Sequence, residues 1–147
     1  MAAIRRAEVI WTGDLMSGAG NITSTTSGAV AGLPVTWASR TETHDGRTSP
    51  EELVAAAHAS CYSMAFSGGL ARNGTPPERL AVSATVTFDK TEAGWQVVSS
   101  ALTVRGRVPG LDAARFAELA EAAKDGCPIS GALKGNVALS VEPTLES

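Results

Sequence analysis

The chain is poor in the residues that would place it among nucleic-acid-binding, secreted or membrane proteins. Its 147 residues include only two cysteines, and the formal net charge is −3. The acidic balance argues against a nucleic-acid surface and against a basic patch for membranes. No apolar signal run follows Met1–Arg6, so we expect a cytoplasmic protein. Two cysteines in that compartment are not expected to form a structural disulfide bond. They are therefore reactive, metal-binding or merely buried thiols.

Internal repeats, linkers and low-complexity segments are also lacking, so residues 1–147 are expected to form a single domain. Alternating and β-branched runs predict strands at 7–14, 21–27, 33–41, 80–89, 95–108 and 136–142. Shorter helices are predicted at 113–124, capped by Asp112, and at 128–133, begun by Pro128. Strands and helices come in blocks rather than in strict alternation, which is typical of the α+β class.

Fixed charge is missing between Glu52 and Arg72, the stretch around which the chain is organised. Ser49 and Pro50 predict a capped helix start, and Asn73–Gly74 predicts its end. An uncharged helix of ~23 residues and roughly 35 Å is expected to be buried on all sides. A chain of this size cannot easily cover it alone, so a second copy is the expected cover. A membrane span is the rival interpretation.

Both cysteines lie at places where chemistry is possible, although each also has a purely structural interpretation. Cys61 lies in the middle of the long helix, one turn after His58, where cysteine is often a small buried hydrophobe. Cys127 lies between a predicted helix end and Pro128, where free backbone amides can lower the pKa of a thiol. The two are far apart in the sequence, so only the fold can bring them together.

The sequences around the two cysteines closely resemble those of a known family. Residues 49–65, with Ala57–Cys61 at their centre, and the later Gly126–Ser130 resemble the OsmC/Ohr family. These are the osmotically inducible protein C and organic hydroperoxide resistance proteins. The resemblance extends to Trp11–Asp14, Val108–Asp112 and the last predicted strand. Within the family, Ala57–Cys61 and Ser39–Arg40 are more similar to the OsmC branch.

This resemblance implies a fold and an activity. The fold is the OsmC-like one, with antiparallel β-sheets packed with a long buried central helix, in an intertwined homodimer with active sites at its interface. The activity is that of a cysteine-based peroxidase without metal, haem or other cofactor. Cys61 matches the peroxidatic cysteine, which forms a sulfenic acid with an organic hydroperoxide, and Cys127 matches the resolving cysteine, which closes a disulfide. A dithiol reductant, often a lipoyl-bearing enzyme in this family, reopens it.

Two charged residues acquire a role only through the resemblance. On the residues alone, Arg40 is a solvated strand-end charge and Glu51 is an acid at a helix start. The family implies instead that Arg40 stabilises the thiolate and that Glu51 holds Arg40 in place. The loop 41–48 differs from the OsmC pattern, so Arg47 is a second candidate. Glu51 and Cys61 lie roughly 15 Å apart along one helix, so we expect Arg40 and Glu51 to serve the Cys61 of a partner chain.

Several alternatives remain open at this point. A metal site is conceivable from His44, His58, Cys61 and Cys127, since a histidine and a cysteine one helical turn apart can bind zinc. A non-enzymatic ligand-binding stress protein on the same fold is another. His58 is expected to pack or to hydrogen-bond inside the interface. Apolar residues near the cysteines favour alkyl or lipid-like hydroperoxides over hydrogen peroxide, unless they are simply core: Leu53, Met64, Phe66, Ile129 and Leu133.

Overall fold

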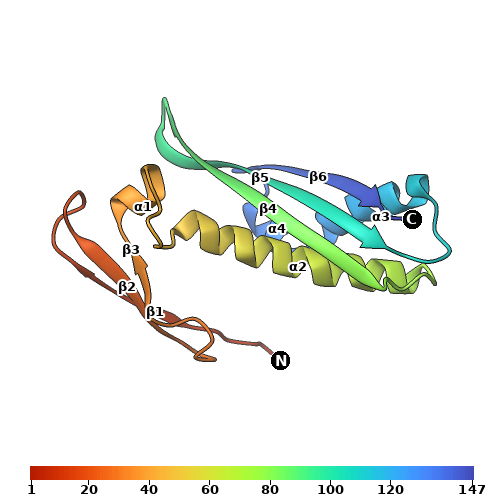
Figure 1. Cartoon of the computed structure of the whole chain (residues 1–147), viewed down its shortest axis with the longest axis horizontal. Coiled ribbons are helices and arrows are strands. Elements are labelled where there is room, and N and C mark those ends of the chain that lie inside the picture. Colours follow the sequence, from red (N-terminus) through yellow and green to blue (C-terminus); the bar gives the residue numbers. More distant parts are fainter. The chain divides into compact units, whose positions relative to one another are not determined.

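The computed structural model describes residues 1–147, which form two compact units, Met1–Leu53 and Val54–Ser147 (Figure 1). The first unit contains β1 (Ala7–Thr12), β2 (Ala19–Thr25), β3 (Leu33–Val35) and α1 (Trp37–Thr41). The long helix α2 (Pro50–Arg72) begins in the first unit and continues through the second. The second unit also contains β4 (Arg79–Thr91), β5 (Gly94–Arg107), α3 (Ala113–Gly126), α4 (Pro128–Leu133) and β6 (Ala138–Leu145). The predicted α+β class is confirmed.

The first unit is a three-stranded antiparallel sheet in the order β1-β2-β3, followed by the short helix α1. The prediction of a strand over 33–41 is wrong beyond Val35. Thr36 caps a helix instead: its hydroxyl accepts from the Ser39 amide, and the Ser39 hydroxyl accepts from the Thr36 amide, both at 3.0 Å. This reciprocal cap satisfies donors that a helix start leaves free. Arg40 therefore lies on a helix and not at the end of a strand.

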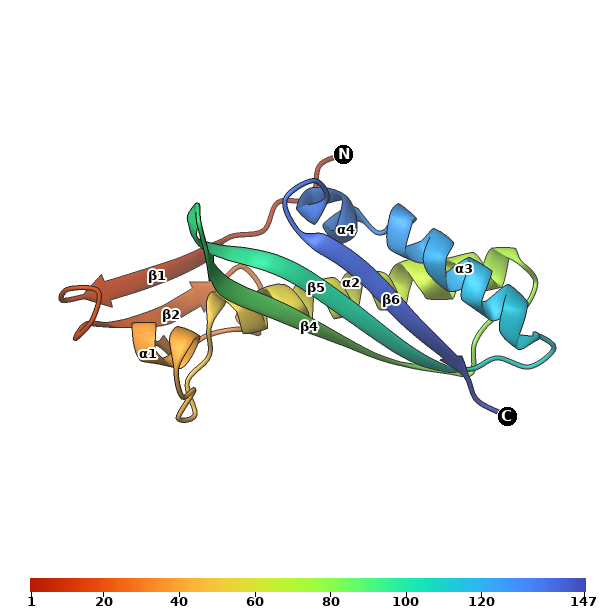
Figure 2. The ribbon, with the colours of Figure 1, turned by 90° about the horizontal axis from the view of Figure 1, so that it is seen from above.

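The sheet of the second unit has the order β4-β5-β6 and is mixed (Figure 2). β4 and β5 form a long antiparallel hairpin, whereas β6 runs parallel to β5 from Ser99↔Ala138 to Gly106↔Leu145. The expected antiparallel pairing is therefore found between β4 and β5 but not between β5 and β6. The chain leaves β5, passes through α3 and α4 and returns as β6, a crossover that produces parallel neighbours. The last strand also begins and ends later than the predicted 136–142.

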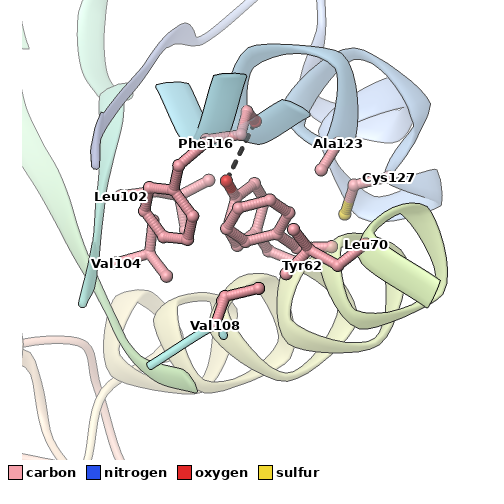
Figure 3. Packing of buried hydrophobic residues seen from close by; sticks show 10 residues of the cluster. Tyr62, Leu70, Leu102, Val104, Val108, Phe116, Ala123 and Cys127 are labelled. Carbon is pink, nitrogen blue, oxygen red and sulfur yellow. Dashed lines mark hydrogen bonds between the residues drawn. The ribbon is translucent and has the colours of Figure 1, made fainter. Parts of the chain in front are cut away.

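The hydrophobic core of the second unit lies where α2 and α3 meet the sheet (Figure 3). One stripe of α2 contributes Tyr62, Phe66 and Leu70, and α3 contributes Phe116. The Phe66 ring packs against Tyr62 at 5.7 Å and against Phe116 at 5.1 Å, measured between ring centroids. The Tyr62 hydroxyl donates to a carbonyl of α3 at 2.9 Å. These contacts fix the face of α2 that also carries His58.

Both ends of α2 form as the sequence predicts. The Ser49 hydroxyl accepts from the Glu52 amide at 3.1 Å. At the other end Gly74 has a φ of +82°, and the amides of Gly74 and Thr75 donate to carbonyls of the last turn at 3.0 Å each. This pair of bonds is a Schellman motif, in which glycine takes the left-handed conformation without steric cost.

The single chain buries α2 only in part. Within the chain only one stripe of the helix is buried, and Met64, on another face, is 70% exposed. The chain by itself thus covers one stripe of the helix, and cover of the other faces by a second copy stays a prediction. None of the helices combines the length and apolarity that crossing a bilayer requires.

Candidate thiol site

The fold brings the two cysteines together. Cys61 is half-buried in the middle of α2, and Cys127 is buried at the junction where α3 ends and α4 begins. Cys127 has an extended backbone (φ −70°, ψ 123°) between the two helices, and Pro128 starts α4 immediately after it. This sharp break allows the Cys127 thiol to approach α2, near enough to the Cys61 thiol for each to affect the pKa of the other. Both are free thiols, and no disulfide joins them.

The two thiols have different acidities because their surroundings differ. Burial is the main cause that raises the pKa of Cys61; the Ile129 amide opposes it, and the neighbouring Cys127 adds to it. Burial also opposes ionisation of Cys127, but hydrogen bonds from the Ser130 amide, the Cys61 thiol and the Ser130 hydroxyl outweigh it and lower its pKa. Burial therefore disfavours a thiolate at Cys61, whereas the groups at the start of α4 favour one at Cys127.

A cavity of about 700 Å³ adjoins Cys61 between α2 and α3. Its lining is mainly small and apolar, and Met64 and Leu119 are its largest aliphatic side chains. Arg72 and Arg115 supply its charged groups. Of the apolar residues predicted to surround the cysteines, Met64 does line this cavity, whereas Phe66 is a fully buried core residue. The cavity can accept an alkyl group beside a thiol.

His58 is fully buried one turn before Cys61, with both ring nitrogens hydrogen-bonded. Nδ1 lies 2.6 Å from the Ser100 hydroxyl of β5, and Nε2 lies 2.8 Å from the Ser130 hydroxyl of α4. Burial lowers the pKa of His58, so the ring is neutral at pH 7. The expectation that His58 hydrogen-bonds is confirmed, with partners in its own chain.

Ser100 was not among the functional residues predicted from the sequence. The available signal was its place two residues before Leu102 on the buried face of β5, where a hydroxyl needs a partner. The metal alternative finds no support, because serines occupy both His58 nitrogens. No group of three His, Cys, Asp or Glu residues in the chain is arranged to hold a metal ion.

The expected pair of charged residues forms in the first unit. The Arg40 guanidinium donates from Nε to both Glu51 carboxylate oxygens at 2.9 and 3.1 Å, and from a terminal nitrogen at 2.7 Å. Glu51 is buried, and the Arg40 guanidinium also lies over the Trp37 ring at 5.8 Å from its centroid. Arg47 is bound to Asp45 at 2.9 Å in an exposed loop. Of the two candidate arginines, only Arg40 is held by Glu51.

The fold and the adjoining thiols define an α+β protein with a paired-cysteine site. A family model described as OsmC-like protein matches residues 43–142, and the chain belongs to this family. The resemblance stated from the sequence is thereby confirmed.

Individual relatives agree with this assignment. Peroxiredoxin OsmC of Escherichia coli (strain K12) is 38% identical over 142 residues, covering 97% of this chain and 98% of the relative. The organic hydroperoxide resistance protein of Xanthomonas axonopodis pv. citri is 31% identical over 91 residues, covering 61% of this chain and 62% of the relative. Among solved structures, the organic hydroperoxide resistance protein OhrB of Bacillus subtilis superposes with a TM-score of 0.73 at 25% identity, covering 95% of this chain and 98% of that one.

Proposed function

We propose that the chain is a thiol-dependent peroxidase that reduces organic hydroperoxides to alcohols in stress defence. The observation that carries the proposal is the proximity of two free thiols from distant segments, one of which, Cys61, lines a largely apolar cavity. The names of the relatives, peroxiredoxin and organic hydroperoxide resistance protein, support a peroxidase-like role.

The chemistry needs only the two thiols and a reductant. The Cys61 thiolate attacks the O–O bond, the alkoxide leaves and takes a proton to become the alcohol, and Cys61 becomes a sulfenic acid. The Cys127 thiolate then attacks the Cys61 sulfur. The S–S bond forms, the S–O bond breaks, and hydroxide leaves and is protonated to water. A dithiol, of which a lipoyl-bearing protein is one candidate, reopens the disulfide by exchange and becomes oxidised itself. No metal or cofactor enters this scheme.

Arg40 and Glu51 complete the proposed site. The pKa of Cys61 is raised within its own unit, so its thiolate needs a positive charge from elsewhere. The Arg40 guanidinium, oriented by Glu51, can supply that charge and donate to the peroxide oxygens. Since α2 carries Glu51 in its first turn and Cys61 in its middle, we assign the pair to the Cys61 of a partner chain in a homodimer.

Exposed apolar side chains in each unit support such a dimer. Met64 projects from α2, and Val9, Ile10 and Trp11 of β1 are all exposed. Large apolar residues exposed together are a common mark of protein interfaces.

The cytoplasmic location of the protein and the organisation of residues 1–147 as one domain stay predictions.

Steady-state turnover of tert-butyl hydroperoxide with dithiothreitol tests the function. Wild-type protein should consume the peroxide, and Cys61→Ser should abolish turnover because the hydroxyl cannot be oxidised to a sulfenic acid. The cavity also suits a non-enzymatic ligand-binding protein, for which Cys61→Ser should keep ligand affinity and the wild type should show no turnover. Equal turnover by both proteins would contradict the peroxidase.

A further inference from the structure

The cavity beside Cys61 has a charged end that takes no part in the scheme above. Its lining on one side runs from Cys61 in α2 to Asn73 just after that helix, roughly 18 Å along the axis. The start of α3 lies at the Asn73 end, because the Arg115 guanidinium donates to the Asn73 side-chain oxygen at 3.2 Å. Gly126 and Pro128, after the end of α3, complete the lining. The cavity therefore has a thiol at one end and arginines at the other.

The two arginines of the cavity differ in their partners. Arg115 is already paired, since its terminal nitrogens donate to Glu118 at 2.9 Å and to Asn73 at 3.2 Å. Arg72, in contrast, makes no side-chain hydrogen bond or ion pair within the chain. No acidic side chain lines the cavity. Arg72 is thus a positive charge without a counter-charge at the end of an apolar cavity.

Two glycines make room for the Arg72 guanidinium. A cation in the last turn of a helix is favoured by the helix dipole alone, but Arg72 also lies against Gly68 and Gly69, one turn earlier. A methyl group added at Gly68 would lie 3.3 Å from one terminal nitrogen of Arg72, and one added at Gly69 would lie 3.9 Å from the other. The guanidinium is therefore directed back along the cavity toward Cys61, as long side chains on helices commonly are.

This position of the guanidinium sets a length for the molecule that the cavity fits. Gly68 and Cys61 lie seven residues apart in α2, roughly 10 Å along its axis. An extended chain advances roughly 1.2 Å per bond, so about eight bonds span that distance. The side chains of Met64, Ala65 and Leu119 line the cavity and are apolar. The matching ligand has a reactive group, an apolar chain of about that length, and an anion.

We propose that the cavity takes hydroperoxides that carry a carboxylate about eight bonds from the peroxide group, and that Arg72 is the residue that gives this specificity. A guanidinium can donate to both carboxylate oxygens, which holds the chain in place with its peroxide group at Cys61. The inference rests on the proposed peroxidase function and names its substrate class. In the covalent step the Cys61 thiolate binds the terminal peroxide oxygen, the O–O bond breaks, and the alkoxide takes a proton to become the alcohol. The carboxylate is unchanged.

Two matched pairs of hydroperoxides are the probes. The first pair is ω-hydroperoxynonanoic acid and its methyl ester, which have the same chain and differ in charge. The second pair is ω-hydroperoxypentanoic acid and its methyl ester, whose chain is too short to reach from Cys61 to the guanidinium. Steady-state turnover of each with dithiothreitol gives kcat and KM separately.

Three variants of the full chain isolate the charge of Arg72. Arg72→Met removes the charge and keeps an aliphatic side chain, and Arg72→Lys keeps the charge but loses the planar pair of donors. Arg105→Met is the matched control. Arg105 is an exposed arginine of β5 that donates to Glu146 at 3.2 Å and does not line the cavity.

We expect wild-type protein to have a kcat/KM about tenfold higher for the nonanoic acid than for its ester, as a hydrogen bond to a charged group predicts. The difference should lie in KM, because Arg72 binds the far end of the substrate and not the O–O bond. Arg72→Met should lose the preference and turn over the ester as before, and Arg72→Lys should retain part of it. Arg105→Met should match wild type, and the short pair should show no preference in any protein.

A second readout does not require turnover. Nonanoate, which has no peroxide group, should slow alkylation of Cys61 by iodoacetamide in the reduced wild-type protein. The concentration needed for half protection should rise about tenfold in Arg72→Met. Nonanol, the neutral counterpart, should protect both proteins equally.

Equal kcat/KM values for the long acid and its ester in wild-type protein would overturn the inference, as would an undiminished preference in Arg72→Met. Sedimentation of the same proteins gives a further check, since a dimer that dissociates on loss of Arg72 would assign this arginine to a contact between chains. Failure of the proposed function is seen separately, as wild-type protein that turns over none of the hydroperoxides. Protection by nonanoate still tests Arg72 in that event.

Discussion

The two residue pairs of the proposed site, one in each compact unit, are chemically opposite. In the first unit Arg40 and Glu51 form a charged pair with three short hydrogen bonds and no thiol among them. In the second unit Cys61 and Cys127 meet among apolar side chains and neutral serines. The first pair has charge without redox chemistry, and the second has redox chemistry without charge.

In the peroxidase that we propose, this difference means that neither pair is sufficient by itself. The surroundings of Cys61 hold it in the protonated form, which is a poor nucleophile. The same surroundings favour ionisation of Cys127, which suits the attack that closes a disulfide. In the reaction that we propose, the second unit supports the second step, and the first step needs the charge that Arg40 of the first unit carries.

Complementation between two inactive chains is the largest effect that this comparison predicts. Cys61→Ser and Arg40→Met should each be inactive alone, but a mixture refolded together should regain turnover. The mixed dimer contains one intact site, in which the Cys61 of one chain meets the Arg40 of the other. Turnover of tert-butyl hydroperoxide with dithiothreitol is the measurement. Mixed dimers without turnover, or a monomer that stays active on dilution, would contradict the shared site.

Arg40 alone should matter more than Arg47. Arg40→Met should lower kcat/KM for the hydroperoxide by about 10²-fold, since it removes a preorganised charge from the attacking thiolate and the leaving oxygen. Glu51→Gln should have a smaller effect, because it loosens Arg40 without removing it. Arg47→Met is the control and should stay near wild type. A larger loss in Arg47→Met than in Arg40→Met would reverse the assignment.

The acidities of the two thiols should respond separately to the loss of Arg40. In Arg40→Met the alkylation profile of Cys61 should move to higher pH by about one unit, since an opposite charge near a thiol lowers its pKa. The profile of Cys127 should stay in place, because its donors lie in its own unit. Peptide mapping of iodoacetamide-treated protein measures both. An equal shift at both cysteines would show that the two pairs are not distinct.

The buried His58 should have a smaller effect, which is on the pH dependence of the free energy of unfolding. Its folded pKa is lowered from 6.5, so the unfolded chain takes up the proton first as the pH falls. The contribution to stability is complete above about pH 6.5 and is lost below it, by at most about 1.4 kcal/mol per pH unit for one proton. Thermal unfolding between pH 7.5 and 5 measures this slope. His58→Gln should flatten it, and an unchanged slope would assign the pH dependence to other groups.

Local signals in the sequence predict the helix ends and the two thiol segments. Ser49, Gly74 and Asp112 mark helix ends, and each forms the expected cap. The motifs around Cys61 and Cys127 identified the family and both thiols. These features succeed because caps and motifs depend on residues that are close in the sequence.

Features that depend on distant segments were not predictable in the same way. One miss was instead local: the Thr36–Ser39 cap follows a β-rich stretch and converts the end of a predicted strand into α1. The parallel pairing of β6 is decided by the crossover, and Ser100 becomes important only when it meets His58. The relative acidity of the thiols also needs the fold, because Ser130 contacts Cys127 through the turn at α4.

Intact mass after one equivalent of tert-butyl hydroperoxide, beside a hydrogen peroxide control, tests the central claim most directly. We predict a rapid loss of two hydrogens from the reduced protein, with Cys61 and Cys127 joined in the peptide map and a slower response to hydrogen peroxide. Gain of one oxygen at Cys61 alone would remove Cys127 as the resolving cysteine. An unchanged mass with both oxidants would contradict the two-cysteine peroxidase.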